Sequence, residues 1–526
     1  MNELVKTKKN KQLQSVFFTK ILIIGGGISG RACAKWLNNK GKEVIIVDSR
    51  NLDDKVIKGT NIVIKTGIKY PLDTSWFNKI DTLIISPGLS PHSSKKSGVA
   101  EMLDLARREE IPVLTELDLF EMAVNTKSQS SNVKEKSNNN YKAPVIAVTG
   151  TNGKTSVVKL VVKLLNSVGI DAQPAGNIRP SLLEAILLRE SIKRMPDVWV
   201  LELSSFQLAL TKRFSPTFST ILNISSDHSD WHENGEEYLH SKLKVFGVPK
   251  PTAKAFICRD EEKLSRVIYK HLRNSNSENI NKHKSFITFG IGLPGEKGDF
   301  GINQSGRFCY RNFLKKNIYH EFELSIKDIN LIGAHNFSNI AFCLAVASQI
   351  TNKFNRIIEV LKNHVAENHR LENFLSLDQT RFFDDSKATN IGATVAAMNS
   401  LKEPIILIIG GDTKGQDFNI LSKFLVSRPP YLIVFGKNVS SICEEFFKAG
   451  LNFYQVENLN EVVSLIKKIV DQKVLKNDLN EKKINVLFSP ACSSLDMFNS
   501  FRHRGQEFKK LIFSEFKVKE TIVGKI

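Results

Sequence analysis

The segment Thr149 to Ser156 carries the residue types that bind a polyphosphate. It reads Thr-Gly-Thr-Asn-Gly-Lys-Thr-Ser and follows the apolar run Val145 to Val148. The backbone amides of such a loop, together with Lys154, can hold phosphate oxygens, and the hydroxyl of Thr155 can ligate Mg²⁺. A full P-loop has another glycine where Val148 stands, so this loop is a shortened variant. We expect it to bind phosphate, although a strand-to-helix turn also uses glycine for purely structural reasons.

Three further side chains that suit a metal or phosphate site follow other apolar runs. Glu202 lies near the end of the run Val198 to Leu203, and a carboxylate so placed is rarely buried without a metal or a cationic partner. His228 follows a second run, and Lys242 lies on an expected helix. A lone histidine is more often a hydrogen-bonded structural residue than a ligand. Here, the phosphate loop and Glu202 are expected at equivalent strand ends of one sheet, where α/β folds collect ligands.

A second glycine loop lies near the N-terminus. Gly25 to Gly30 follows an apolar run and opens a helical pattern, and Asp48 ends the next run. This spacing fits a dinucleotide fingerprint, in which glycines let the backbone approach a diphosphate. One hypothesis is therefore a nicotinamide or flavin oxidoreductase. The alternative is a tight strand-to-helix turn that needs glycine only for packing.

The elements that carry these loops are short apolar runs that alternate with helical periodicity. Continuous apolar strands of this kind are typical of parallel sheets covered by helices on both faces. We expect an α/β protein. The runs are Lys20 to Ile24, Glu43 to Val47, Thr82 to Ile85, Val145 to Val148, Val198 to Leu203, Pro404 to Ile409, Tyr431 to Phe435 and Asn485 to Phe488.

The length of 526 residues points to about three domains. Residues 125–142 are rich in Asn, Ser, Lys and Gln and almost free of apolar side chains, so we expect a flexible linker there. A helical stretch, 336–365, precedes a new series of strands. We therefore expect an N-terminal domain over 1–124, a central domain over 143–367 and a C-terminal domain over 368–526.

Charge and cysteine content narrow the function classes. The formal net charge is +20, which suits anionic partners. Apart from the first residues, however, no long basic run interleaved with aromatic residues is present, so we do not expect a nucleic-acid partner. The six cysteines include no Cys-x-x-Cys pair, and no apolar run reaches the ~18 residues of a membrane span. We expect a cytoplasmic enzyme that acts on polyphosphate substrates.

Three motifs in the last third of the chain make a family resemblance specific. They are Asp385-Ser386-Lys387-Ala388-Thr389-Asn390, Gly410-Gly411-Asp412-Thr413-Lys414-Gly415 and Ser489-Pro490-Ala491-Cys492-Ser493-Ser494-Leu495-Asp496. Together with the phosphate loop they resemble the Mur ligase family, over essentially the whole chain, and within it the branch that adds D-glutamate.

This resemblance implies a Rossmann-like N-terminal domain, a central ATPase sheet of the P-loop type and a Rossmann-like C-terminal domain. The implied activity is ATP-dependent addition of D-glutamate to UDP-N-acetylmuramoyl-L-alanine through an acyl phosphate, in peptidoglycan precursor synthesis. The glycine loop would then hold a diphosphate without redox chemistry. We expect a monomer.

The resemblance also implies roles for individual residues. ATP would contact Gly150, Thr151, Asn152, Gly153, Lys154, Thr155, Ser156, Asn336, Asn339, Arg370, Asp385 and Lys387. The uridine nucleotide would contact Ile28, Ser29, Asp48, Ser49, Arg50, Ser86, Gly88, Asn177, Ser204 and Gln207. D-Glutamate would contact Thr389, Lys414, Ser494 and Phe501.

The implied catalytic residues are Lys154, Glu202, His228 and Lys242. One Mg²⁺ would be held by Thr155 and Glu202 and a second by His228 and Lys242. Because an ammonium cannot ligate a cation, Lys242 would act as a carbamate, as its counterpart does in the family; the alternative is an ammonium that contacts phosphate.

Several single positions admit a second interpretation. Arg179 stands where the family has a glycine after Gly176-Asn177-Ile178, which puts the local backbone conformation in question. Arg370 and Asp385 could form an ordinary ion pair between domains, Phe501 could be a core residue, and Ser494 could be a helix N-cap.

Overall fold

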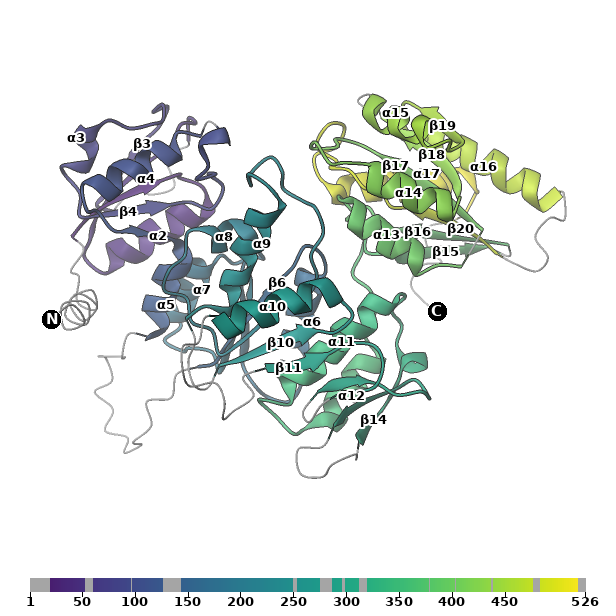
Figure 1. Cartoon of the computed structure of the whole chain (residues 1–526), viewed down its shortest axis with the longest axis horizontal. Helices are drawn as coiled ribbons and strands as arrows, with labels where there is room; N and C mark the ends of the chain where they lie inside the picture. The colour runs from purple at the N-terminus through teal and green to yellow at the C-terminus, as the bar shows by residue number, and fades with distance from the viewer. Residues whose placement is uncertain are drawn as a thin grey trace.

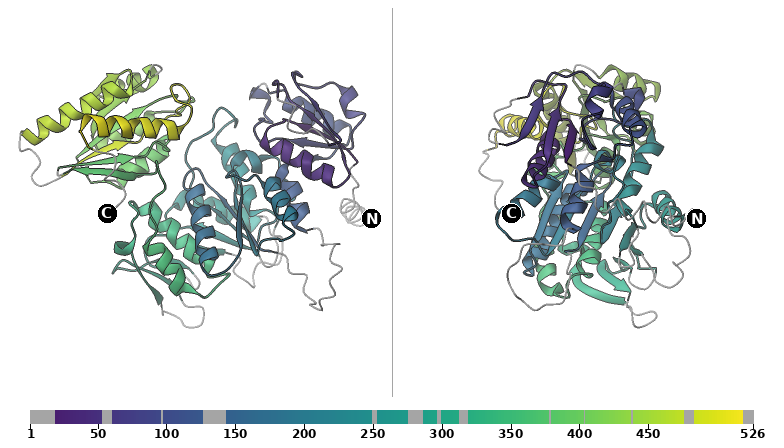
Figure 2. Two further views of the ribbon diagram at one scale, coloured as in Figure 1. Left: turned by 180° about the vertical axis from the view of Figure 1, so that it is seen from behind. Right: turned by 90° about the vertical axis from the view of Figure 1, so that its left-hand side faces the viewer.

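The computed structural model describes residues 19–52, 60–95, 97–125, 143–248, 253–274, 286–295, 299–311, 319–377, 379–402, 404–436, 439–475 and 483–518. Their elements form three α/β units in chain order, each around its own large sheet. The first lies at the upper left of Figure 1, the second below and the third at the upper right. Figure 2 shows them from behind and from the side. The predicted linker lies outside the described residues except for Asn125, and the three domain boundaries stay predictions.

The first sheet is entirely parallel, with the strand order β3-β2-β1-β4-β5. Its strands are β1 (Lys20–Ile24), β2 (Glu43–Val47), β3 (Ile62–Lys65), β4 (Thr82–Ile85) and β5 (Val113–Leu114). The helices of this region are α2 (Ile28–Asn39), α3 (Thr74–Phe77), α4 (Val99–Arg108), α5 (Glu116–Asn125) and the 3₁₀ turn η3 (Ser93–Lys95).

The second sheet is also parallel, in the order β11-β10-β9-β6-β8-β7. Its strands are β6 (Val145–Thr149), β7 (Ala172–Gly176), β8 (Val198–Glu202), β9 (Phe218–Ile221), β10 (Lys254–Cys258) and β11 (Phe286–Phe289). Its helices are α6 (Lys154–Ser167), α7 (Leu182–Ser191), α8 (Ser205–Ala209), α9 (Gly235–Leu243), η4 (Lys244–Phe246), α10 (Glu262–Asn274), α11 (Ala334–Ala347) and α12 (Phe354–Lys362).

A small antiparallel sheet extends this second unit. It contains β12 (Phe300–Ile302), β13 (Arg307–Arg311) and β14 (Tyr319–Ser325), and the 3₁₀ turn η6 (Ile326–Asp328) follows it. The apolar runs do not predict this sheet, because β14 alternates exposed and buried side chains in Glu321 to Leu324 and so lacks a continuous apolar stretch.

The third sheet has the order β15-β16-β20-β17-β18-β19, and only β15 runs antiparallel to its neighbour. Its strands are β15 (Glu372–Leu377), β16 (Thr380–Asp384), β17 (Ile405–Gly410), β18 (Tyr431–Phe435), β19 (Phe453–Val456) and β20 (Ile484–Phe488). Its helices are α13 (Ile391–Asn399), α14 (Asn419–Ser427), α15 (Ser440–Lys448), α16 (Leu459–Leu475) and α17 (Phe501–Glu515).

The eight apolar runs all coincide with strands to within one residue, which confirms the predicted α/β class. Their side chains form buried clusters on both faces of each sheet, as helix-covered parallel strands require. The predicted helical stretch 336–365 is two helices, α11 and α12, separated by 348–353. All six cysteines are free thiols. None of the described helices combines the length and the apolar character that crossing a bilayer demands.

One buried cation organises the loops at the carboxyl edge of the third sheet. Arg504 on α17 is fully buried, and burial lowers the pKa of its guanidinium to about 10. It donates to the carbonyls of Ser386, Cys492 and Ser493 at 2.9, 3.0 and 3.2 Å, and to the hydroxyl of Ser386 at 3.1 Å. It also donates to the Gly410 carbonyl at 3.5 Å, so all three C-terminal motifs are held against one side chain.

We expect Arg504→Met to destabilise the third unit, because each buried carbonyl left without a donor costs roughly 1 to 3 kcal/mol. Urea unfolding followed by circular dichroism should show a lower midpoint. Arg502→Met is the matched control, since Arg502 lies two residues away on the same helix and is exposed. Equal midpoints for the two variants would mean that Arg504 does not hold the loops.

Candidate active site

The phosphate loop connects β6 to α6 and is fixed by an asparagine of the neighbouring strand end. Gly150 and Gly153 adopt positive φ angles of 151° and 84°, which favour glycine. The amide of Asn152 donates to Oδ1 of Asn223 at 2.8 Å, and Nδ2 of Asn223 donates to the carbonyl of Asn152 at 3.1 Å. Asn223 follows β9, which pairs with β6 in the sheet. The loop is therefore held in shape before any ligand binds.

Two lysines, Lys242 fully buried and Lys154 partly buried, converge on this loop. Nζ of Lys154 donates to the carbonyls of Gly150 and Thr151, both at 2.8 Å, and Nζ of Lys242 donates to the same Gly150 carbonyl at 2.9 Å. Lys242 is 1% exposed, and its Nζ lies 4.6 Å from the centre of the Tyr238 ring. Burial lowers the pKa of both amines, and the neighbouring Lys154 lowers the pKa of Lys242 further.

Glu202 is a buried carboxylate with one free oxygen. It ends β8 and is 2% exposed. Its Oε1 accepts a hydrogen bond from Nδ2 of Asn177 at 2.8 Å, whereas Oε2 has no hydrogen-bond partner among the described residues. A buried carboxylate oxygen without a donor requires a cation. The donor set therefore fits Mg²⁺, which prefers oxygen ligands.

The strand end after β9 adds further polar groups to the same region. His228 has a positive φ of 57°, and its Nε2 lies 3.7 Å from Oδ2 of Asp227. Burial lowers the pKa of the His228 imidazole, which favours the neutral form that binds metals. Oγ of Ser225 is buried and has no hydrogen-bond partner in the part of the chain that the structure describes. Nδ2 of Asn390, from the third unit, donates to Asp227 at 3.2 Å.

The third unit contacts the phosphate loop through Asn390, and two of its predicted residues, Arg370 and Lys387, lie near Lys154. Nδ2 of Asn152 donates to Oδ1 of Asn390 at 3.2 Å. Burial has the largest effect on Lys154 and lowers its pKa. The charge of Arg370 lowers this pKa further, so Arg370 lies near Lys154. Burial lowers the pKa of Lys387 to about 8, with Arg370 adding to the effect, and its Nζ lies 4.1 Å from the centre of the Phe501 ring.

Asp385 and Arg370 do not form an ion pair with each other. Arg370 pairs with Glu367 at 3.4 Å, while Asp385 accepts from the Ser489 hydroxyl at 2.8 Å and the Leu371 amide at 3.0 Å. Burial raises the pKa of Asp385 to about 7, against the effect of these hydrogen bonds. The carboxyl group is thus set deep between β16 and β20, and it joins two of the C-terminal motifs.

The residues predicted to contact D-glutamate lie on loops at the carboxyl edge of the third sheet. Lys414 has an exposed side chain and a positive φ of 49°, and its carbonyl accepts from Oγ of Ser229 in the second unit at 3.2 Å. Ser494 is buried and is not the cap of α17, because Ser500 caps that helix. Phe501 begins α17 beneath Lys387, and Thr389 directly precedes the N-cap of α13.

The residues predicted to contact the uridine nucleotide cluster around the glycine loop after β1. The amide of Gly26 and the guanidinium of Arg50 both donate to Asp48, the guanidinium at 2.8 and 3.0 Å. The hydrogen bonds from Arg50 lower the pKa of Asp48 to about 2. Oγ of Ser86 donates to the Gly25 carbonyl at 2.8 Å. The remaining predicted residues of this unit are Ile28, Ser29, Ser49 and Gly88, which lie at or near the surface beside this loop.

A small cavity separates this cluster from the second unit. Ser86 and Glu116 line one side of it, and Gln207 lines the other. Ser204 and Gln207 form a capping box at the start of α8, in which the Ser204 amide donates to Gln207 Oε1 at 3.0 Å. Of the residues predicted to contact the uridine nucleotide, Ser86 of the first unit and Gln207 of the second thus line one cavity.

Asn177 contacts Glu202 even though Arg179 stands where the family has a glycine. A Cβ added at Gly176, which has a φ of 111°, would lie 2.2 Å from the Glu202 carbonyl, so β7 and β8 approach closely there. The amide of Asn177 donates to that carbonyl at 2.8 Å. Arg179 instead pairs with Glu184 at 3.5 Å. The extra side chain therefore does not alter the contact between Asn177 and Glu202.

Asn336 and Asn339 lie on the first turns of α11, and Asn339 packs against the phosphate loop. Nδ2 of Asn336 donates to the Ile332 carbonyl at 2.7 Å. A Cβ at Gly153 would lie 3.3 Å from Nδ2 of Asn339.

Sequence reasoning missed the roles of Asn223, Asn390 and Tyr238 around the same loop. Tyr238 shares a hydrogen bond of 3.0 Å with the hydroxyl of Thr151. Asn390 ends the first of the three C-terminal motifs, but nothing in the sequence tells which amide bridges two units.

Comparison with known proteins agrees with this geometry. Residues 148–347 match the family model of the Mur ligase middle domain, and residues 19–102 match that of the MurD-like Mur ligase N-terminal domain. The chain is 30% identical over 516 residues to the UDP-N-acetylmuramoylalanine--D-glutamate ligase of Cupriavidus pinatubonensis, covering 94% of this chain and 96% of that protein. It is 30% identical over 500 residues to the same enzyme of Nitrosomonas europaea, covering 93% and 95% of the two chains.

Among solved structures, the chain resembles Mycobacterium tuberculosis folylpolyglutamate synthase complexed with ADP. The TM-score is 0.53 at 15% sequence identity, with 75% of this chain and 92% of that chain covered. This likeness shows a shared fold. Because two ligases match at 30% identity over nearly their whole length, and the phosphate loop, Glu202 and Lys242 meet at one sheet edge, the chain belongs to the Mur ligase family.

Proposed function

We propose that this chain uses ATP to join D-glutamate to UDP-N-acetylmuramoyl-L-alanine, an amide-forming step of peptidoglycan precursor synthesis. The observation that carries the proposal is the convergence of Lys154 and Lys242 on the phosphate loop, beside the free oxygen of Glu202. The two ligases compared above are named for joining D-glutamate to UDP-N-acetylmuramoylalanine. We place the reaction in the cytoplasm and expect one chain to act alone, because the described contacts assemble the site within one chain.

A carboxylate resists attack by an amine because its leaving group is poor. The proposed route transfers the γ-phosphoryl group of ATP to the L-alanine carboxylate and forms an acyl phosphate. The amine of D-glutamate then attacks the carbonyl carbon, and phosphate leaves. Lys154 and the loop amides would hold the phosphates and offset the repulsion between the triphosphate and the incoming carboxylate.

Mg²⁺ would be held by Glu202 and Thr155, with His228 and Lys242 proposed for a second ion. When bound, the ions supply positive charge that neutralises phosphate oxygens. The chain's own residues prepare this position: Asn177 orients one oxygen of Glu202 and leaves the other free. Asp227 and Asn390 hold the strand end that carries His228.

The third unit would provide the amino-acid pocket and part of the ATP site. Burial lowers the pKa of both Lys154 and Lys387, and the charge of Arg370 lowers both further, so these three cations lie close together and suit phosphate binding. Lys414 offers an exposed cation, and Ser494 and Thr389 offer hydroxyl groups, which suits a dicarboxylate. Since the groups come from different units, substrate binding would bring them together and exclude water from the acyl phosphate.

We expect phosphate release to require both the uridine nucleotide and D-glutamate. L-Glutamate and diaminopimelate should support little or none, because the Lys414 motif and the relatives both point to D-glutamate. The measurement is phosphate release with ATP, UDP-N-acetylmuramoyl-L-alanine and each amino acid in turn. Turnover with diaminopimelate in place of D-glutamate would assign a different activity to the chain.

We expect Lys414→Ala to lower kcat/KM for D-glutamate by roughly 10- to 100-fold, which corresponds to loss of one charge-assisted hydrogen bond. Binding of the uridine nucleotide, measured by calorimetry, should change little. Lys448→Ala, an exposed lysine on α15 of the same unit, is the control. If the uridine nucleotide no longer bound and the use of D-glutamate were unchanged, the amino-acid pocket would lie elsewhere.

We propose that Lys242 acts as a carbamate. Carbamylation needs the neutral amine, and the burial of Lys242 beside Lys154 favours that form. Removing bicarbonate should lower activity reversibly, and Lys242→Glu should retain more activity than Lys242→Arg because it keeps an anionic oxygen.

A second readout for Lys242 does not depend on turnover. After incubation with ¹³C-bicarbonate, the protein should give a carbamate resonance in NMR that Lys242→Arg lacks and Lys244→Arg, the control two residues further on, keeps. Full activity of decarbonated protein together with a well-tolerated Lys242→Arg would favour an ammonium that contacts phosphate.

A further inference from the structure

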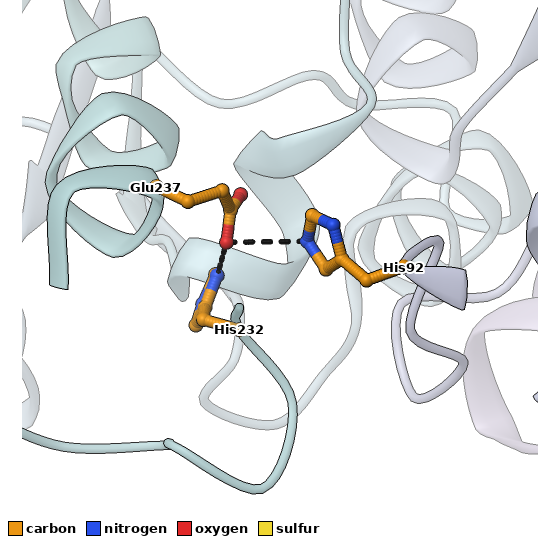
Figure 3. A group of neighbouring side chains, drawn as sticks. All are labelled: His92, His232 and Glu237. Carbon is orange, nitrogen blue, oxygen red and sulfur yellow. Dashed lines mark hydrogen bonds and ion pairs between the residues drawn. The ribbon is translucent and has the colours of Figure 1, made fainter. Parts of the chain in front are cut away.

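Two histidines and a glutamate from different units meet outside the proposed active site. His92 follows β4 in the first unit, and His232 and Glu237 belong to the approach and first turn of α9 in the second. Nε2 of His92 lies 3.2 Å from Oε2 of Glu237, and Nδ1 of His232 contacts the same oxygen. Figure 3 shows both rings turned toward this single carboxylate oxygen. The three ligand atoms all lie within 4.8 Å of one another.

The outer atoms of both rings have their own partners. Nε2 of His232 lies 2.8 Å from Oγ of Ser205, which can accept a hydrogen bond from it. Nδ1 of His92 lies 3.8 Å from Oε1 of Glu233. Nδ1 of His232 shares a hydrogen bond with Glu237, so without a metal a proton lies between these two groups, and a bound cation would replace it. Once that proton is lost, the two inner nitrogens and the carboxylate oxygen present lone pairs to one another, which is the arrangement that a metal ion can bridge.

Within the described part of the chain, no lysine or arginine forms an ion pair with Glu237, whose ion pairs are with His92 and His232. The positive charge of Lys244 lies near enough to be influenced by Glu237, but its ammonium donates to the Ala209 carbonyl instead. The three inward-facing ligand atoms therefore have no ammonium or guanidinium of the described chain between them.

A comparable cluster in the third unit differs because a lysine pairs with its carboxylates. It is formed by His369, Glu372 and Asp384. There Lys509 lies 2.6 and 3.3 Å from the two carboxylates, so an ammonium already balances their charge.

We propose that His92, His232 and Glu237 bind a divalent transition-metal ion of the Zn²⁺ class, which joins the first and second units. Two imidazole nitrogens and one carboxylate oxygen suit Zn²⁺, whereas Mg²⁺ and Ca²⁺ prefer oxygen ligands alone. The 3.2 Å between His92 and Glu237 is close to the separation of two ligands around a tetrahedral zinc ion, about 3.3 Å for bonds of about 2.0 Å. Water would complete the coordination.

Hydrogen bonds between the first and second units lie next to this cluster. Oγ of Ser90 donates to the Trp231 carbonyl at 2.7 Å, and Nζ of Lys95 donates to the Ser229 carbonyl at 2.6 Å. The side chain of His232 is 1% exposed and that of His92 16%, so the ligands are held but one remains reachable from solvent. The ion would tie the segment after β4, part of which lines the small cavity beside Ser86 and Gln207, to α9. This inference does not depend on the ligase activity.

The test measures Zn²⁺ binding to the whole chain. Protein treated with a chelator is transferred to millimolar Mg²⁺, which occupies the oxygen site near Glu202, and Zn²⁺ is titrated in competition with a chromophoric chelator. We expect one tight equivalent per chain. His92→Ala and Glu237→Gln should weaken it at least tenfold. His240→Ala, which removes an exposed histidine of α9 outside the cluster, should bind as the wild type does.

Cobalt provides a spectroscopic check of the ligands. Co²⁺ bound at the cluster should give visible absorption bands that His92→Ala lacks and His240→Ala keeps. Circular dichroism of the metal-free variants tests whether each is folded. If Glu237→Gln does not fold, the metal binding of His92→Ala is enough to test the proposal. The proposal is overturned if the wild type takes up no stoichiometric Zn²⁺, or if His92→Ala retains the tight site.

Discussion

A single backbone carbonyl, that of Gly150, accepts hydrogen bonds from two ammonium groups, one buried and one partly buried. Lys154 and Lys242 donate to it at 2.8 and 2.9 Å. Two like charges so close in a buried place repel each other unless anions are added. The phosphates of ATP provide such anions, and carbamylation of Lys242 would turn one of the two cations into an anion. The described site is therefore built for a ligand of high negative charge.

The geometry of parallel sheets explains why the other groups arrive at the same place. Glu202 ends β8 and Asn223 follows β9, and these strands flank β6, which leads into the phosphate loop. Because the carboxyl ends of parallel strands meet at one edge, residues distant in the sequence become neighbours. In the third sheet, too, loops that are distant in the sequence meet at the carboxyl edge of the strands. The buried side chain of Arg504 donates hydrogen bonds to the carbonyls of these loops.

The strands and the phosphate loop could be predicted from sequence because each is a local pattern: an apolar run, or glycines at fixed spacing from a lysine. The free oxygen of Glu202 fits the expectation that a carboxylate at a buried strand end needs a cation. Contacts between units could not be predicted, since the amide of Asn390 reaching Asn152 depends on how two units dock. The cluster around Glu237 was missed for the same reason, as His92 is 140 residues from His232 in the chain.

The contacts between units are of two unlike kinds. Asp118 of α5, at the end of the first region, is fully buried and accepts hydrogen bonds from the Thr211 hydroxyl and the amides of Lys212 and Arg213 in the second unit. The third unit touches the phosphate loop through Asn390, a buried side chain whose hydrogen-bond partners Asn152 and Asp227 are partly exposed. Because these partners are partly exposed to water, their hydrogen bonds cost less to break than the fully buried ones to the Asp118 carboxylate. The described hydrogen bonds therefore hold the second unit to Asp118 more firmly than they hold the third unit to the phosphate loop.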